Sequence, residues 1–98
     1  MKTARTKIVK VKPTADRNQL RKEFYDGIKN HQWDLVETVR RFRIMLGMNQ
    51  TEFAHYSGLT SRAITEFEQR KRNPTLKTLE KMLKGSGLQL GIVLRKNP

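Results

Sequence analysis

The chain has 98 residues, 36% of them hydrophobic, which is enough for one domain with a single core. Lys and Arg outnumber Asp and Glu by 21 to nine; the net charge of +12 favours nucleic acid as partner, with improved solubility as the alternative. The composition has no cysteine, two histidines in no ligand spacing and no apolar run of about 20 residues, so we expect a cytoplasmic protein without disulfide, metal site or membrane span.

Residues 1–30 are predicted to form a basic arm followed by an extra helix. The first part of the arm is rich in Lys and Arg, and its segment KIVKVK has the β-branched content of a short strand. Apolar residues then recur every four positions, at Leu20, Phe24 and Ile28. This period predicts a helix that Asp16 caps and that is interrupted or ends near Gly27.

Caps and glycines divide residues 31–86 into short amphipathic helices. The spacing of Asp34 with an acidic residue three positions later predicts a capping box, and Gly47 is placed to end that helix. The same pattern at Asn49 predicts a second, short helix that stops at Gly58. We therefore expect two short helices joined by a tight turn in the middle of this segment.

Two further helices and a strand are predicted after this turn. Thr60 is placed to cap one helix, and the NPT at 73–75 precedes the last helix, which the GSG at 85–87 ends. Apolar residues alternate in the final segment, residues 87–98, at Leu88, Leu90, Ile92 and Leu94. This is strand spacing, and such a strand must pair either with the N-terminal KIVKVK or with the same strand of a second subunit.

The helix after Thr60 is predicted to carry a compact polar face. At 100° per residue its polar residues gather on one side, namely Ser61, Arg62, Thr65, Glu66 and Gln69. The apolar residues of the helix lie opposite. Such short polar side chains let a helix backbone approach a DNA groove, and the turn at Gly58 matches a helix-turn-helix. Gly-linked helix pairs also occur in all-α domains that contact no DNA.

The segment NQTEFAHYSGLTSRAITEFEQ, residues 49–69, resembles the helix-turn-helix of the lambda-repressor/Cro (Xre) family. The family's small, turn and core positions are matched by Ala54, Gly58, Leu59, Ile64 and Phe67. The likeness extends over about residues 34–85. It implies a mainly α fold, a lambda-repressor-like bundle of four to five helices, and binding to double-stranded DNA.

The resemblance and the geometry of the major groove assign residues to the DNA. The residues expected to face base edges are Ser61, Arg62, Thr65 and Glu66. Those expected to contact phosphates are Asn49, Gln50, Thr60, Arg70, Lys71 and Arg72. Arg43 and Glu68 match a family pair that orients the helices. The alternative for the RKR run at 70–72 is an ordinary solvated loop.

Family members of this size usually bind inverted-repeat operators as two-fold dimers, which implies a homodimer. A strand after the last helix resembles HipB-like antitoxins, in which the strands of two subunits pair. This second resemblance implies a cognate kinase-like toxin as a further partner and repression of the operon that encodes both. A stand-alone or phage-derived Xre-family regulator is the alternative. Residues 1–30 depart from the antitoxin pattern, and their role stays open between toxin binding, DNA contacts and a solubilising tail.

Catalysis finds no support in the sequence. The chain lacks a Gly-rich phosphate loop, a plausible catalytic triad and a cluster of metal ligands, so we expect no catalytic residue and no cofactor. A pure protein-interaction module would show an apolar or acidic outer face on the helix after Gly58. Ser61, Arg62 and Thr65 do not supply such a face.

Overall fold

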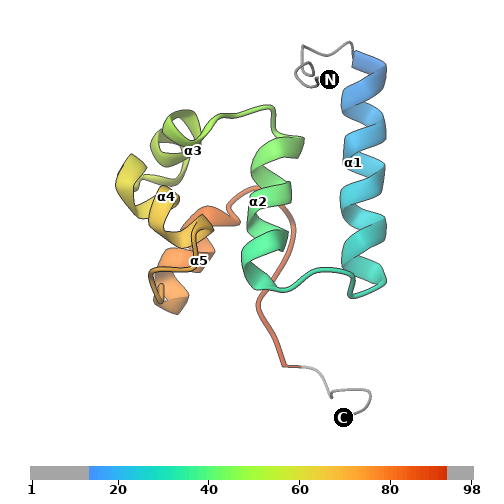
Figure 1. The fold of residues 1–98 in the computed structure, drawn as a ribbon. Helices are drawn as coiled ribbons and strands as arrows, with labels where there is room; N and C mark the ends of the chain where they lie inside the picture. The colour runs from blue at the N-terminus through green and yellow to red at the C-terminus, as the bar shows by residue number, and fades with distance from the viewer. Residues whose placement is uncertain (1–13, 93–98) are drawn as a thin grey trace, which may run out of the picture. The chain divides into compact units, whose positions relative to one another are not determined.

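The computed structural model describes residues 14–92, and within this range the chain forms five α-helices and no β-strand (Figure 1). The helices are α1 Thr14–Lys29, α2 Leu35–Met45, α3 Gln50–Ser57, α4 Ser61–Glu68 and α5 Leu76–Met82. The chain divides into two compact units at Met48: an N-terminal unit with α1 and α2, and a C-terminal unit with α3, α4 and α5. The predicted mainly helical fold is confirmed.

In the N-terminal unit, α1 passes without interruption through Gly27, near which it was predicted to be interrupted or to end. The helix begins at Thr14, so Asp16 lies inside it, and it continues through Gly27 to Lys29. The indole of Trp33 packs where a side chain at Gly27 would lie, and a Cβ there would overlap the ring. Gly27 therefore makes room for an aromatic side chain and does not interrupt the helix, which ends two residues later.

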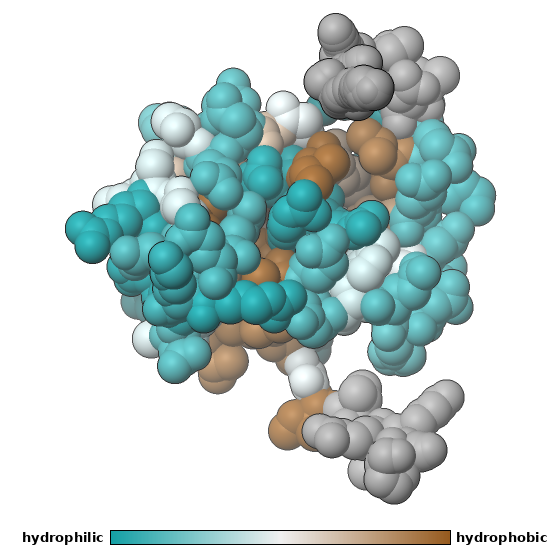
Figure 2. Space-filling view, viewed as in Figure 1, coloured by the Kyte–Doolittle hydropathy of each residue, from teal (hydrophilic) through white to brown (hydrophobic). Residues whose placement is uncertain are grey.

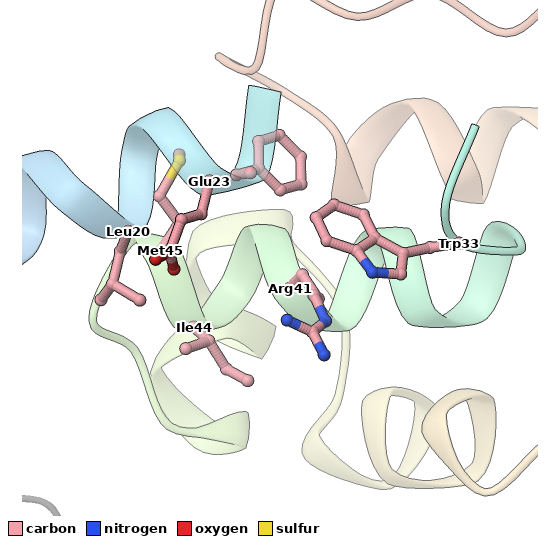
Figure 3. Close-up of a pocket in the computed structure, with 7 residues that line it drawn as sticks. Leu20, Glu23, Trp33, Arg41, Ile44 and Met45 are labelled. Carbon is pink, nitrogen blue, oxygen red and sulfur yellow. The ribbon is translucent and has the colours of Figure 1, made fainter. Parts of the chain in front are cut away.

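Aromatic side chains form the core of this unit. Phe24 is 2% exposed and Phe42 1% exposed, and their ring centroids lie 5.8 Å apart. Trp33 stacks on Phe24 at 5.9 Å. Trp33 and Arg41 also line a small pocket between α1 and α2 (Figure 3), where the Arg41 guanidinium lies 4.9 Å from the indole centroid. The guanidinium thereby covers part of an otherwise apolar surface.

Three predicted caps form, at Asp34, Asn49 and Thr60, whereas Asp16 lies inside α1 and does not cap it. Asp34 accepts a hydrogen bond from the amide of Glu37 at 2.9 Å and begins α2. Asn49 and Glu52 form a complete capping box at the start of α3, with bonds of 2.8 and 2.9 Å. Thr60 accepts from the third residue of α4 at 3.1 Å. These caps satisfy amide donors that a helix start leaves without intrahelical partners.

In the C-terminal unit, α3 packs mainly against α4 and also contacts α5 (Figure 1). Gly58 adopts a left-handed φ of 71° between α3 and α4, as the turn requires. Large apolar side chains from all three helices are fully buried, namely Phe53, Ile64, Phe67 and Met82. The turn and this core fix the orientation of α4 within the unit.

The segment after α5 is attached to α3 through Tyr56. Its hydroxyl donates to the carbonyl of Lys84, and the Lys84 ammonium lies 5.3 Å from the ring centroid. The next residue, Gly85, has a left-handed φ of 81°, and the Tyr56 hydroxyl would lie 2.6 Å from a Cβ there. A glycine is therefore required at this position, both for the turn and for the tyrosine.

Residues 88–92 do not form the predicted strand in the single chain. Leu88 and Leu90 are half-buried, and Ile92 is fully exposed. A lone strand is unstable because its backbone groups lack partners, so strand pairing with a second chain stays a prediction. Leu94 and the N-terminal KIVKVK lie outside the described residues.

Candidate nucleic-acid interface

Helix α4 has the two faces that its sequence predicts. Ala63, Ile64 and Phe67 are buried in the C-terminal unit. On the other side Ser61 and Arg62 are exposed, and the Arg62 side chain keeps 83% of its surface accessible. Figure 2 shows mostly hydrophilic residues over α3 and α4. The helix therefore presents hydrogen-bonding groups to the solvent while its apolar side anchors it.

A single carboxylate holds two arginines on this face. Glu66 Oε2 accepts from Arg62 Nε at 2.9 Å, one helical turn away. Glu66 Oε1 accepts from Arg72 Nη2 at 2.8 Å and from Arg72 Nε at 3.2 Å. We refer to these three residues as the Arg62–Glu66–Arg72 cluster. Residues predicted separately as base contacts and as a phosphate contact thus form one electrostatic unit.

The ionisation of the cluster follows from these contacts. The hydrogen bonds from Arg62 and from Arg72 hold the pKa of Glu66 below its ordinary value. The hydrogen bond between Arg62 and Glu66, together with the negative charge of Glu66, raises the pKa of Arg62. Glu66 and Arg62 are therefore both charged at neutral pH.

A second network links the start of α3 to α4. The Thr65 hydroxyl donates to Gln50 Oε1 at 2.9 Å, and Gln50 Nε2 donates to Glu68 Oε1 at 3.0 Å. Both ends of the Gln50 amide thus bond to α4. Gln50 was predicted as a phosphate contact and Thr65 as a base contact. In this structure their polar groups bind each other and hold α3 against α4. No sequence period joins positions 50 and 65, so sequence reasoning missed this network.

The predicted phosphate contacts at the two helix starts are exposed. Asn49 and Thr60 each use a side-chain oxygen to cap their helix. The side-chain nitrogen Nδ2 of Asn49 and the hydroxyl proton of Thr60 are donors that these caps do not use. The Ser61 hydroxyl lies beside them, 3.5 Å from the Thr51 hydroxyl. Donors from α3 and α4 therefore gather at adjacent helix starts.

The RKR run that follows α4 has a defined backbone. Arg70 adopts a left-handed φ of 63°, which glycine usually provides at this position. The Arg70 amide bonds the carbonyl of Phe67 at 3.0 Å, and the Lys71 amide bonds that of Glu66 at 2.8 Å. This hydrogen-bonded turn closes the helix and is followed by Arg72, which folds back onto Glu66. The run is thus held in place beside the polar face of α4.

Arg43 and Glu68, the predicted orienting pair, belong to different units. Arg43 Nη1 donates to the Met48 carbonyl at 2.9 Å in the N-terminal unit. Glu68 accepts from Gln50 in the C-terminal unit. The pair itself stays a prediction.

Comparison with known protein families matched residues 39–91 to a family described as helix-turn-helix. This segment is more than half of the chain, and it contains every residue predicted to contact DNA. The chain belongs to the lambda-repressor-type (Xre) helix-turn-helix family. Membership supports a DNA-binding transcription regulator. The curated proteins and the solved structures gave no match.

No helix within residues 14–92 has the length and apolar content needed to cross a bilayer. The same residues contain no group of three or more His, Cys, Asp or Glu side chains that could hold a metal ion.

Proposed function

We propose that this protein is a sequence-specific transcriptional repressor that binds operator DNA in the cytoplasm with α4 in the major groove. The observation that carries the proposal is the exposed polar face of α4, from which Arg62 extends while the opposite face is buried. The major groove of B-DNA admits an α-helix. The two terminal amino groups of Arg62 match the O6 and N7 acceptors of guanine.

The contacts around α4 divide by role. Ser61 and Arg62 extend from the first turn, where a recognition helix reaches base edges. Thr65 uses its hydroxyl on Gln50, so we assign its methyl group to a thymine methyl. Phosphates would be contacted by the flanking donors, which are Asn49, Thr60, Arg70, Lys71 and Arg72. Such contacts fix register and carry no direct sequence information.

The repressor is proposed to act as a homodimer on an inverted repeat. Ile92 is fully exposed at the end of the described chain, and it shares an alternating pattern with Leu88 and Leu90. An apolar strand of this kind gains backbone partners only by pairing, and a second copy offers an identical strand. Dimerisation through residues 88–94 would thereby create the strand.

The C-terminal pattern also supports the antitoxin hypothesis, in which a kinase-like toxin is the second partner. The stand-alone regulator rests on the family match alone. Purification of the protein from its native operon distinguishes the two. A toxin that co-purifies and is neutralised supports the antitoxin, whereas a homodimer that represses without a partner supports the stand-alone regulator.

The DNA-binding proposal is tested by selecting bound duplexes from a random pool. We expect an inverted repeat whose half-sites lie about one helical turn apart. Arg62→Ala should then cost about 1–3 kcal/mol on the selected operator and relax base preference at one position. Lys77→Ala is the matched control, because Lys77 is an exposed cation on α5. Enrichment of no sequence would contradict sequence-specific binding, and enrichment of a single half-site would contradict the dimer.

A further inference from the structure

Glu66 occupies a position that helix stability does not explain. It lies in the last turn of α4, where the helix dipole disfavours negative charge. Its partner Arg62 lies four residues earlier, the less favourable order for an ion pair on a helix. Exposed pairs of this kind also contribute little to stability. The carboxylate is therefore better explained by what it does to the arginines.

The cluster leaves one edge of Arg62 available in a defined direction. Glu66 binds the Nε of Arg62, so this hydrogen bond leaves the outer edge of the guanidinium, which its two terminal nitrogens form, available. This outer edge is one that donates to guanine O6 and N7 in a bidentate contact. An arginine with 83% of its side chain exposed would otherwise sample many rotamers. Glu66 thereby orients Arg62 before DNA arrives.

The cluster also lowers the attraction of this surface for phosphate. The single negative charge of Glu66 lies 2.9 Å from one arginine nitrogen and 2.8 Å from the nearest nitrogen of the other arginine. Non-specific binding to DNA grows with the number of phosphates that cations neutralise. Glu66 partly neutralises both guanidinium groups and thereby weakens their attraction for the charged phosphates, whereas neutral guanine can be bound with the Arg62–Glu66 bond intact.

We propose that Glu66 is a specificity-determining positioning residue, which aligns Arg62 for guanine and withholds Arg62 and Arg72 from the phosphates of non-operator DNA. This inference rests on the proposed DNA-binding function and adds a role that the base contacts alone do not contain. Glu66→Gln removes the charge and keeps the shape of the side chain. The variant should bind random-sequence DNA more tightly and should lose selectivity for the operator.

The test compares wild type, Glu66→Gln and Glu80→Gln on the selected operator and on a scrambled duplex at several salt concentrations. Glu80 is an exposed acid on α5, so its substitution changes the net charge equally and leaves the cluster intact. For Glu66→Gln we expect a steeper log–log salt dependence on scrambled DNA, by about one unit relative to Glu80→Gln. The ratio of operator to scrambled affinity should fall about fivefold or more.

A double-mutant cycle separates positioning from a general structural effect. If Glu66 acts through Arg62, the fall in the affinity ratio should largely disappear when Glu66→Gln is made in an Arg62→Ala background. An equal fall in both backgrounds would overturn the positioning role. A changed base preference at one position, with unchanged affinity for scrambled DNA, would instead make Glu66 a direct base contact and would also overturn the proposal.

Different outcomes overturn the proposed function and the role of Glu66. If wild type shows no preference for any sequence, the proposed function fails and this role of Glu66 fails with it. If wild type is selective and Glu66→Gln keeps the affinity ratio of Glu80→Gln, only the role of Glu66 is overturned. Thermal unfolding of each variant, followed by circular dichroism, verifies that the measurements compare folded proteins.

Discussion

Arg70→Gly should make the protein more stable and its binding to DNA weaker. Arg70 adopts a left-handed φ of 63° directly after α4. A residue with a Cβ pays about 1–2 kcal/mol for this conformation, and glycine does not. The backbone amide of Arg70 keeps its bond to the Phe67 carbonyl in either case. The substitution therefore relieves strain and removes one cation beside the proposed DNA-binding surface.

The two effects can be given magnitudes. Glycine also loses about 0.5–1 kcal/mol through the greater freedom of the unfolded chain, so the net gain for Arg70→Gly lies in the range of about 0–1.5 kcal/mol. A change of about 1 kcal/mol moves the melting temperature of a domain of this size by roughly 4–8 °C. Loss of one phosphate contact should reduce the slope of log Kd against log salt by about 0.9. Thermal unfolding and a salt titration on the operator measure the two quantities.

Two variants control this experiment. Arg70→Ala removes the same charge and keeps a Cβ, so it should weaken DNA binding equally and melt below Arg70→Gly. Lys71→Gly removes a neighbouring cation at a residue whose φ is not positive, so it should bring no gain in stability. If Arg70→Gly melts no higher than Arg70→Ala, the left-handed backbone is not the source of strain and the reasoning is refuted.

Three further predictions concern single contacts. Gly27→Ala should lower stability by about 1–3 kcal/mol, as measured by thermal unfolding, because the new methyl group overlaps the indole of Trp33. Gly91→Ala should be nearly neutral in the same measurement, because no atom lies within 4 Å of the new Cβ. Thr65→Val should cost about 0.5–1.5 kcal/mol by breaking the bond to Gln50, and an unchanged melting temperature would contradict the network. The carboxyl of Glu66 should titrate below its ordinary pKa in a carbon NMR experiment. Its favourable interaction with the two arginines is then present at neutral pH and is lost as the pH falls through that lowered pKa. A titration at the ordinary pKa would show that the arginines do not bind this carboxyl in solution.

The features that the sequence predicted correctly are local. The caps at Asp34, Asn49 and Thr60 each join residues three positions apart, so the spacing of side chains in the sequence contains the whole interaction. The apolar face of α4 follows from a repeat of 3.6 residues in the same way. Local geometry therefore accounts for the helix starts and for the surface that α4 presents.

The features that escaped prediction depend on packing across longer distances. Gly27 reads as a helix breaker, but glycine inside a helix costs only about 1 kcal/mol, and the contact with Trp33 decides the outcome. The link from Gln50 to Thr65 joins side chains of two helices and follows no period. The strand predicted over residues 88–92 does not form in the single chain, because it needs a partner that one sequence does not specify. In each case the outcome depends on a partner group that lies outside the segment in which the sequence pattern occurs.

Two departures from local helix rules meet at the end of α4, and together they support a surface selected for binding. Glu66 places a negative charge where the helix dipole disfavours it, and Arg70 occupies a conformation that favours glycine. A left-handed backbone alone does not indicate function, because His31 has a φ of 51° at the end of α1, outside the matched family segment. His31→Gly should therefore stabilise the fold as Arg70→Gly does, yet leave operator affinity and its salt dependence unchanged. If His31→Gly weakened operator binding as much as Arg70→Gly, the loss could not be assigned to a phosphate contact of Arg70.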